Sequence, residues 1–119
     1  MRTYTTARQK AGTAEAREGQ RLIIGPWDHL ATNGVYADRS FGPLADAQMM
    51  GLTGLHMKFF GRWLRGGTAA LDDVAPVKIF VMGIDQWRDE QAWPLPDTRW
   101  TDFHLTSTAT PTPPTATAC

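Results

Sequence analysis

The sequence predicts an α/β chain, and two observations lead to that prediction. A short apolar run without alternation, Leu22 to Ile24, stops at Gly25-Pro26, as expected of a strand buried on both faces of a parallel sheet. A longer segment, Leu44 to Leu64, repeats its large apolar residues at steps of three and four, which is the spacing of an amphipathic helix. A strand followed by such a helix is typical of α/β proteins.

Composition narrows the classes of function. The 119 residues, 42% of them apolar, have the length of one ordinary domain. Twelve basic and twelve acidic residues cancel without clustering, so neither nucleic acid nor a membrane is expected as a partner. No apolar stretch is long enough to cross a bilayer and the start is polar, which predicts a cytoplasmic protein. Cys119 has no second cysteine with which to form a disulfide.

The first half of the chain reads as helix, strand, loop and helix. The segment from Thr3 to Glu18 favours a surface helix that Gly19 ends. After the strand, residues 27–43 form a long loop with a turn at Asn33-Gly34, and loops of this length are often functional. The following helix ends at a glycine pair, and its expected core stripe consists of Leu52, Leu55, Phe59 and Trp63.

The second half changes character. Residues 68–76 read as a linker, and the β-branched run from Val77 to Met82 predicts a strand that ends at Gly83. Pro94 and Pro96 argue against a regular element over residues 84–96, whereas residues 99–105 allow a further strand. Residues 106–118 contain only Thr, Ser, Ala and Pro, which predicts a disordered tail. Neither half contains enough strands for a complete sheet.

His29 is the candidate catalytic residue. It follows the first strand closely, and the carboxyl ends of parallel strands are where open α/β sheets hold their catalytic groups. Asp28 is adjacent, but neighbouring side chains point in different directions, so it is not expected to be the acid partner of His29. Asp38 is expected to shape the loop, or to pair with Arg39 or another neighbour.

Two other interpretations of the polar and aromatic residues are less favoured. Asp28, His29, Asp38 and His56 match no metal-ligand spacing, so no metal is expected, and His56 and His104 are assigned packing or surface roles. The tryptophans of the second half resemble a stacking platform only superficially, because charges and prolines separate them. The expected role of these tryptophans is to pack the second half of the chain onto the first. They are Trp87, Trp93 and Trp100.

Three blocks of the sequence resemble the CocE/NonD family of serine hydrolases, which is related to X-Pro dipeptidyl-peptidases. They are RLIIGPWDH at 21–29, FFGRWLRG at 59–66 and VKIFVMGIDQWRDEQAWPLPDTRW at 77–100. Together they extend the resemblance over residues 2–105. It implies an α/β-hydrolase domain, a jelly-roll domain after it, and a Ser-Asp-His triad whose histidine corresponds to His29. That histidine would act as general base on an ester or amide, including X-Pro peptide-like substrates, without a cofactor.

The resemblance also implies a division of the chain. Residues 1–67 would be the end of the α/β-hydrolase domain, 68–75 a linker, 76–105 the first strands of the jelly-roll and 106–119 a low-complexity tail. No G-x-S-x-G nucleophile elbow occurs in the sequence, and the family's acid block is absent, so the chain is interpreted as a fragment that is inactive alone. The alternative is a non-catalytic interaction module, or a half that complements a separate upstream chain. The oligomeric state stays open.

Overall fold

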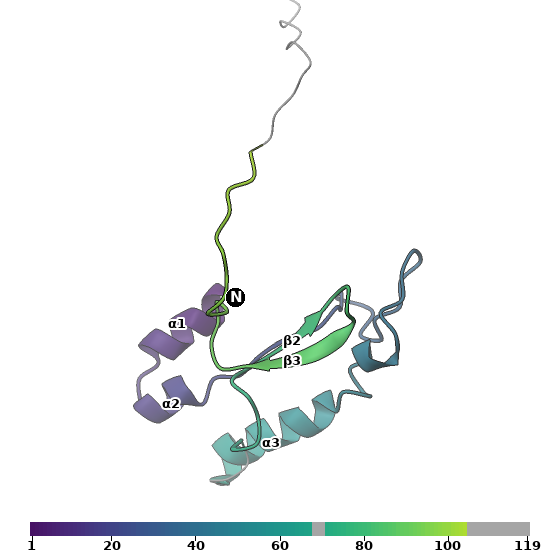
Figure 1. The fold of residues 1–119 in the computed structure, drawn as a ribbon. Helices are drawn as coiled ribbons and strands as arrows, with labels where there is room; N and C mark the ends of the chain where they lie inside the picture. Colours follow the sequence, from purple (N-terminus) through teal and green to yellow (C-terminus); the bar gives the residue numbers. More distant parts are fainter. Residues whose placement is uncertain (68–70, 105–119) are drawn as a thin grey trace, which may run out of the picture.

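Two short helices begin the chain in the computed structural model, which describes residues 1–67 and 71–104 (Figure 1). They are α1 (Arg2–Lys10) and α2 (Ala14–Glu18). The single predicted helix is therefore interrupted, because Ala11 adopts an extended backbone and Thr13 starts a second helix. The Thr13 hydroxyl accepts a hydrogen bond from the backbone N–H of Ala16 at 3.0 Å, which is an N-cap.

The strand β1 (Leu22–Ile24) confirms the predicted parallel strand. It pairs in parallel with β2 (Val77–Val81), with Leu22 opposite Val77 and Ile24 opposite Ile79. Its three residues are half-buried, whereas the sequence predicted burial on both faces. In the sheet order β1-β2-β3, β1 is an edge strand within the described part of the chain. Its side chains therefore have neighbours from another strand on one side only and stay partly exposed.

The strand β3 (Gln86–Glu90) corrects the prediction of an irregular segment over residues 84–96. It runs antiparallel to β2, and the two prolines on which that prediction relied lie beyond its last residue. Positive φ angles at Gly83 (103°) and Asp85 (52°) make the tight turn between the two strands. Across the hairpin, the ammonium of Lys78 forms an ion pair with the carboxylate of Asp89 directly opposite.

A turn of 3-10 helix, η1 (Pro43–Ala45), precedes the long helix α3 (Leu52–Arg65). The helix thus starts later than predicted, because the Asp46 carboxylate accepts backbone N–H groups of the turn and Gly51 has a φ of 79°. Gly66 ends α3 in the left-handed conformation, as predicted. The expected stripe is half-buried along its length: Leu52, Leu55, Phe59 and Trp63.

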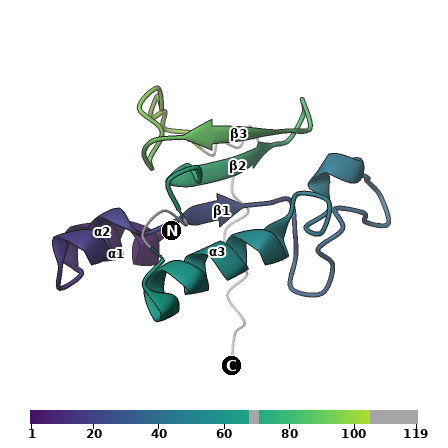
Figure 2. The same cartoon turned by 90° about the horizontal axis from the view of Figure 1, so that it is seen from below.

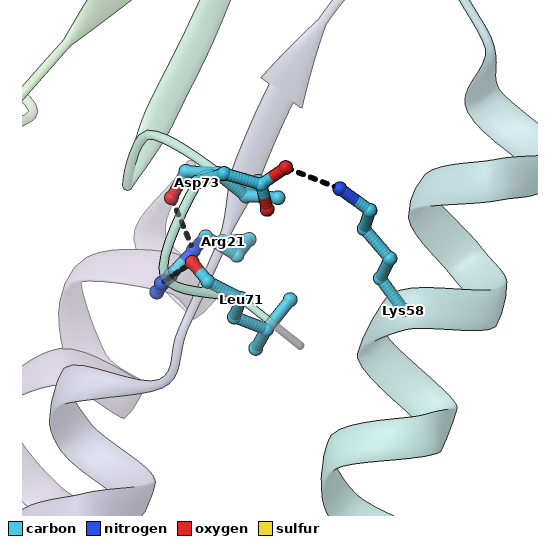
Figure 3. A network of polar contacts seen from close by, with 5 residues as sticks. Arg21, Lys58, Leu71 and Asp73 are labelled. Atoms are coloured by element: carbon cyan, nitrogen blue, oxygen red, sulfur yellow. Dashed lines mark hydrogen bonds and ion pairs between the residues drawn. The ribbon is translucent and has the colours of Figure 1, made fainter. Parts of the chain in front are cut away.

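Residues 71–76, which lead from α3 towards β2, are bonded to Arg21, the residue just before β1. Figure 2 shows the arrangement of β1, α3 and β2. The Arg21 guanidinium donates to the carbonyls of Val74 (3.1 Å) and Leu71 (3.2 Å). On the opposite side, the ammonium of Lys58 on α3 pairs with the carboxylate of Asp73 (Figure 3). These contacts hold the crossover segment, so residues 71–76 form a bonded connection and not an extended linker.

Strands from both predicted domains therefore share one sheet. β1 belongs to the stretch assigned to the first domain, and β2 and β3 belong to the stretch assigned to the second. The division at residues 68–75 stays a prediction. Residues 99–104 form no strand, and the remaining expectations, for Leu105 and for the tail at 106–119, lie outside the described residues. None of the described helices is long and apolar enough to cross a membrane.

The small core lies where the loop after β1 meets the hairpin. Its buried cluster consists of Phe41, Ala45 and Phe80, with Tyr36 and Trp87 packed against it. The rings of Phe41 and Phe80 meet edge to face, with their centroids 6.1 Å apart. Loop residues 36–45 and the hairpin thus stabilise each other.

Candidate active site

His29 lies on the loop that leaves the carboxyl end of β1, as the sequence predicted. Gly25 and Pro26 follow the last strand residue and turn the chain away from the sheet. The imidazole of His29 is exposed to solvent.

Asp28 closes the turn that carries His29. Its carboxylate accepts the backbone N–H groups of Leu30 at 2.7 Å and Ala31 at 2.6 Å. These two bonds favour the charged carboxylate and hold the pKa of Asp28 below its usual range. The carboxylate is committed to its own turn, which agrees with the interpretation that Asp28 is not the acid partner of His29.

The loop is also anchored by two aromatic side chains, one before and one after His29 in the sequence. The indole N–H of Trp27 donates to the carbonyl of Ala45 at 2.6 Å. The hydroxyl of Tyr36 donates to the carbonyl of Pro26, also at 2.6 Å. Sequence reasoning assigned no role to either residue. The available signal was only that both aromatics lie close to the candidate histidine in the sequence.

The other candidate polar residues lie away from His29 or have different partners. Arg39 pairs with Asp85 of the hairpin turn at 3.7 Å, and its guanidinium lies 4.5 Å from the ring centre of Phe41. Arg39 thus contacts the hairpin, and of the alternatives for Asp38, shaping the loop or pairing with another neighbour stays a prediction. The described residues hold no group of three or more His, Cys, Asp or Glu side chains that could bind a metal ion.

The three tryptophans of the second half differ in their contacts. Trp87 packs against the loop as predicted, with its ring centroid 5.7 Å from that of Trp27. Trp93 shares a shallow hollow with Tyr4 of α1. Trp100 is 83% exposed, so its predicted packing is wrong, because residues 99–104 form no strand that would hold it against the body.

An apolar groove separates α3 from β1. It encloses about 470 Å³. Its lining comes from β1 and the residue before it, from the α3 stripe, and from the crossover segment. His56 of α3 lies on its wall. The principal lining residues are Arg21, Ile23, Leu55, His56, Phe59 and Leu71.

Sequence comparison relates the chain to an esterase. It is 46% identical over 105 residues to cocaine esterase of Rhodococcus sp. (strain MB1 Bresler), and the match covers 88% of this chain. The chain is therefore homologous to cocaine esterase and corresponds to a fragment of a protein of that type. It spans 17% of the length of that relative. A comparison with models of protein families finds no match.

Proposed function

We propose that this chain is the histidine-bearing segment of a serine hydrolase that cleaves ester bonds, and that His29 is its general base. The observation that carries the proposal is the position of His29 at the exit of a parallel strand, in a chain that is 46% identical to an esterase. Hydrolysis of amides, including X-Pro peptide-like bonds, is the finer alternative. The serine and the aspartate of the triad would come from residues outside this sequence.

The proposed chemistry uses the imidazole in both directions. As the serine oxygen attacks the carbonyl carbon of the substrate, the imidazole takes the serine proton. It then returns that proton to the leaving alcohol, and an acyl-enzyme remains. In the second half, the imidazole takes a proton from water as the water oxygen attacks the acyl carbon. The imidazolium then gives that proton to the serine oxygen as the bond between serine and the acyl carbon breaks and the acid leaves. An exposed side chain after the strand can reach a serine and a substrate that approach from outside this chain.

The division into domains is part of the proposal. Residues 1–67 would complete an α/β-hydrolase domain, and residues 76–105 would begin a jelly-roll domain. Support comes from the change from helix-rich to strand-rich structure near residue 70. The pairing of β1 with β2 would then join the two domains through one sheet.

The test is a chimera in which residues of this chain replace the matched 105-residue segment of cocaine esterase. We expect the chimera to hydrolyse esters, and its His29→Gln variant to lose at least 1000-fold in kcat, as expected on removal of a triad member. His104→Gln is the matched control, because His104 is exposed and does not line the groove, and it should keep its activity. An active His29→Gln chimera would contradict the proposal.

A second candidate function is assembly with a separate chain that carries the rest of such an enzyme. The groove between α3 and β1 is apolar, and α3 has no buried residue although one of its faces is apolar. Ile23 and Phe59 lie on opposite walls of this groove. Apolar surface of this kind favours association. The partner expected at this groove is a chain that offers parallel strands and a helix with an apolar face.

Co-expression with cocaine esterase that lacks the matched segment tests this candidate. We expect the two chains to copurify, and Leu55→Glu in the groove to abolish copurification. Met49→Glu is the control, because Met49 is 74% exposed and does not line the groove. If the chains do not copurify, or if both variants behave alike, the assembly function is wrong.

A further inference from the structure

Two indole groups that are far apart in the sequence donate to consecutive carbonyls of one turn. Trp27, on the loop after β1, donates to the carbonyl of Ala45 at 2.6 Å. Trp87, on β3, donates to the carbonyl of Leu44, also at 2.6 Å. Both carbonyls belong to η1, so this short turn is bonded from the loop and from the hairpin at the same time.

The two indoles also contact each other. Their ring centroids are 5.7 Å apart and the rings are tilted by 53°. On its other side, Trp87 meets the buried ring of Phe80 edge to face at 5.4 Å. A chain of ring contacts therefore runs from the hairpin core to Trp27, which lies two residues before His29.

The backbone beside Trp27 has little room to move. The Trp27 ring lies over Gly25, where an added Cβ would come within 2.5 Å of a ring atom. The hydroxyl of Tyr36 holds the carbonyl of Pro26 at 2.6 Å. Beyond Trp27, the carboxylate of Asp28 fixes the next turn. The backbone on both sides of Trp27 is thus constrained by specific bonds.

We propose that Trp87 is a positioning residue for His29: through Trp27 and η1, the β2–β3 hairpin sets the direction in which the loop presents the imidazole. This rests on the proposed role of His29 as general base. The exposed imidazole depends on the backbone of residues 27–31 for its orientation. A displacement of about 1 Å in a catalytic group is enough to lower a rate by about 100-fold.

The first test uses this chain in solution. ¹⁵N relaxation of the amides of residues 27–31 reports loop motion, and hydrogen exchange of the Trp27 indole reports its bond to Ala45. Trp87→Phe keeps a ring and removes the N–H, whereas Trp87→Ala removes both. We expect increased motion and faster exchange in both variants, with the larger effect in Trp87→Ala. Trp100→Ala, which alters an 83% exposed side chain, should leave both signals unchanged.

The second test measures kcat and KM in the cocaine esterase chimera. A displaced base slows chemistry, so Trp87→Ala should lower kcat by 10-fold or more with KM within 2-fold, and Trp87→Phe should restore part of kcat. Unchanged loop motion in folded Trp87→Phe would overturn the proposal, as would a change in KM alone. If loop motion responds but His29→Gln stays active, the positioning contact stands and the role of His29 as base fails.

Discussion

Gly19 offers a sharp test of how α3 is attached to the start of the chain. A Cβ added at Gly19 would lie 2.1 Å from the ring carbon Cζ2 of Trp63, whereas ordinary contact begins at 3.4 Å. The backbone at Gly19 has a φ of −74°, which alanine adopts without strain. The substitution Gly19→Ala therefore acts by steric overlap, and the Trp63 ring must withdraw by more than an ångström.

The expected cost of this overlap is about 1–3 kcal/mol of unfolding free energy, the usual range for overpacking. Urea titration followed by circular dichroism measures it, and with a slope of about 1–2 kcal/mol/M the midpoint should fall by about 1 M. Gly12→Ala is the matched control, because a Cβ there has no neighbour within 4 Å. It should be neutral or slightly stabilising, since alanine restricts the unfolded chain.

A double-mutant cycle that combines Gly19→Ala with Trp63→Phe tests whether the two residues are in contact. Trp63→Phe removes the ring carbons that meet the new Cβ, and it also removes the Trp63 indole N–H, which is buried and has no hydrogen-bond partner among the described residues. We expect Gly19→Ala to cost about 1 kcal/mol less in the Trp63→Phe background, because neighbouring sites couple. Equal stability of Gly19→Ala and Gly12→Ala would refute the packing of Trp63 on Gly19.

Three further predictions concern the core, the loop and the chemistry. Val77 is fully buried, so Val77→Ala should cost about 2 kcal/mol in a urea titration, whereas Val35→Ala at a half-exposed site should change stability by about 0.5 kcal/mol or less; equal effects would contradict the core assignment. The pKa of Asp28 is lowered in the folded chain. Its turn should therefore be fully formed at a pH above 3.8, the ordinary pKa of aspartate, and should be lost as the pH falls through the lower pKa of the folded chain. NMR shifts of the Leu30 and Ala31 amides should report this loss, and Asp28→Ala should show the open-turn shifts already at neutral pH; a wild-type turn unaffected by acid would argue against it. The isolated chain should hydrolyse activated esters no faster than free imidazole at equal concentration, because it has no nucleophile elbow; labelling of this chain by a serine-reactive probe would show the opposite.

Local sequence patterns predicted the elements whose signal lies within a few residues. The run before Gly25-Pro26 gave β1, the β-branched run gave β2, and Gly66 gave the end of α3. The hairpin strand β3 was missed because Pro94 and Pro96 outweighed the turn at Gly83, although both prolines lie beyond the strand. Side-chain bonds from Asp46 delay the start of α3, and periodicity alone does not report such bonds.

The candidate site was predictable in part. The position of His29 follows from local rules, because a strand end and a glycine-proline pair are visible in the sequence. The surroundings of His29 depend on tertiary contacts between Trp27, Trp87 and η1, which connect distant segments. No spacing rule joins residues so far apart, so the contacts of Trp87 became visible only in the folded structure.

Chemical rescue of His29 tests the central claim most directly. In the cocaine esterase chimera, His29→Gly leaves space for an added imidazole, and the turnover of an activated ester is measured against imidazole concentration. The account predicts near-complete loss of activity without imidazole and a saturable recovery with it, whereas His104→Gly, at an exposed position outside the helices and strands, should need no rescue. Activity of His29→Gly without imidazole, at the level of the unsubstituted chimera, would contradict the assignment of His29 as the general base.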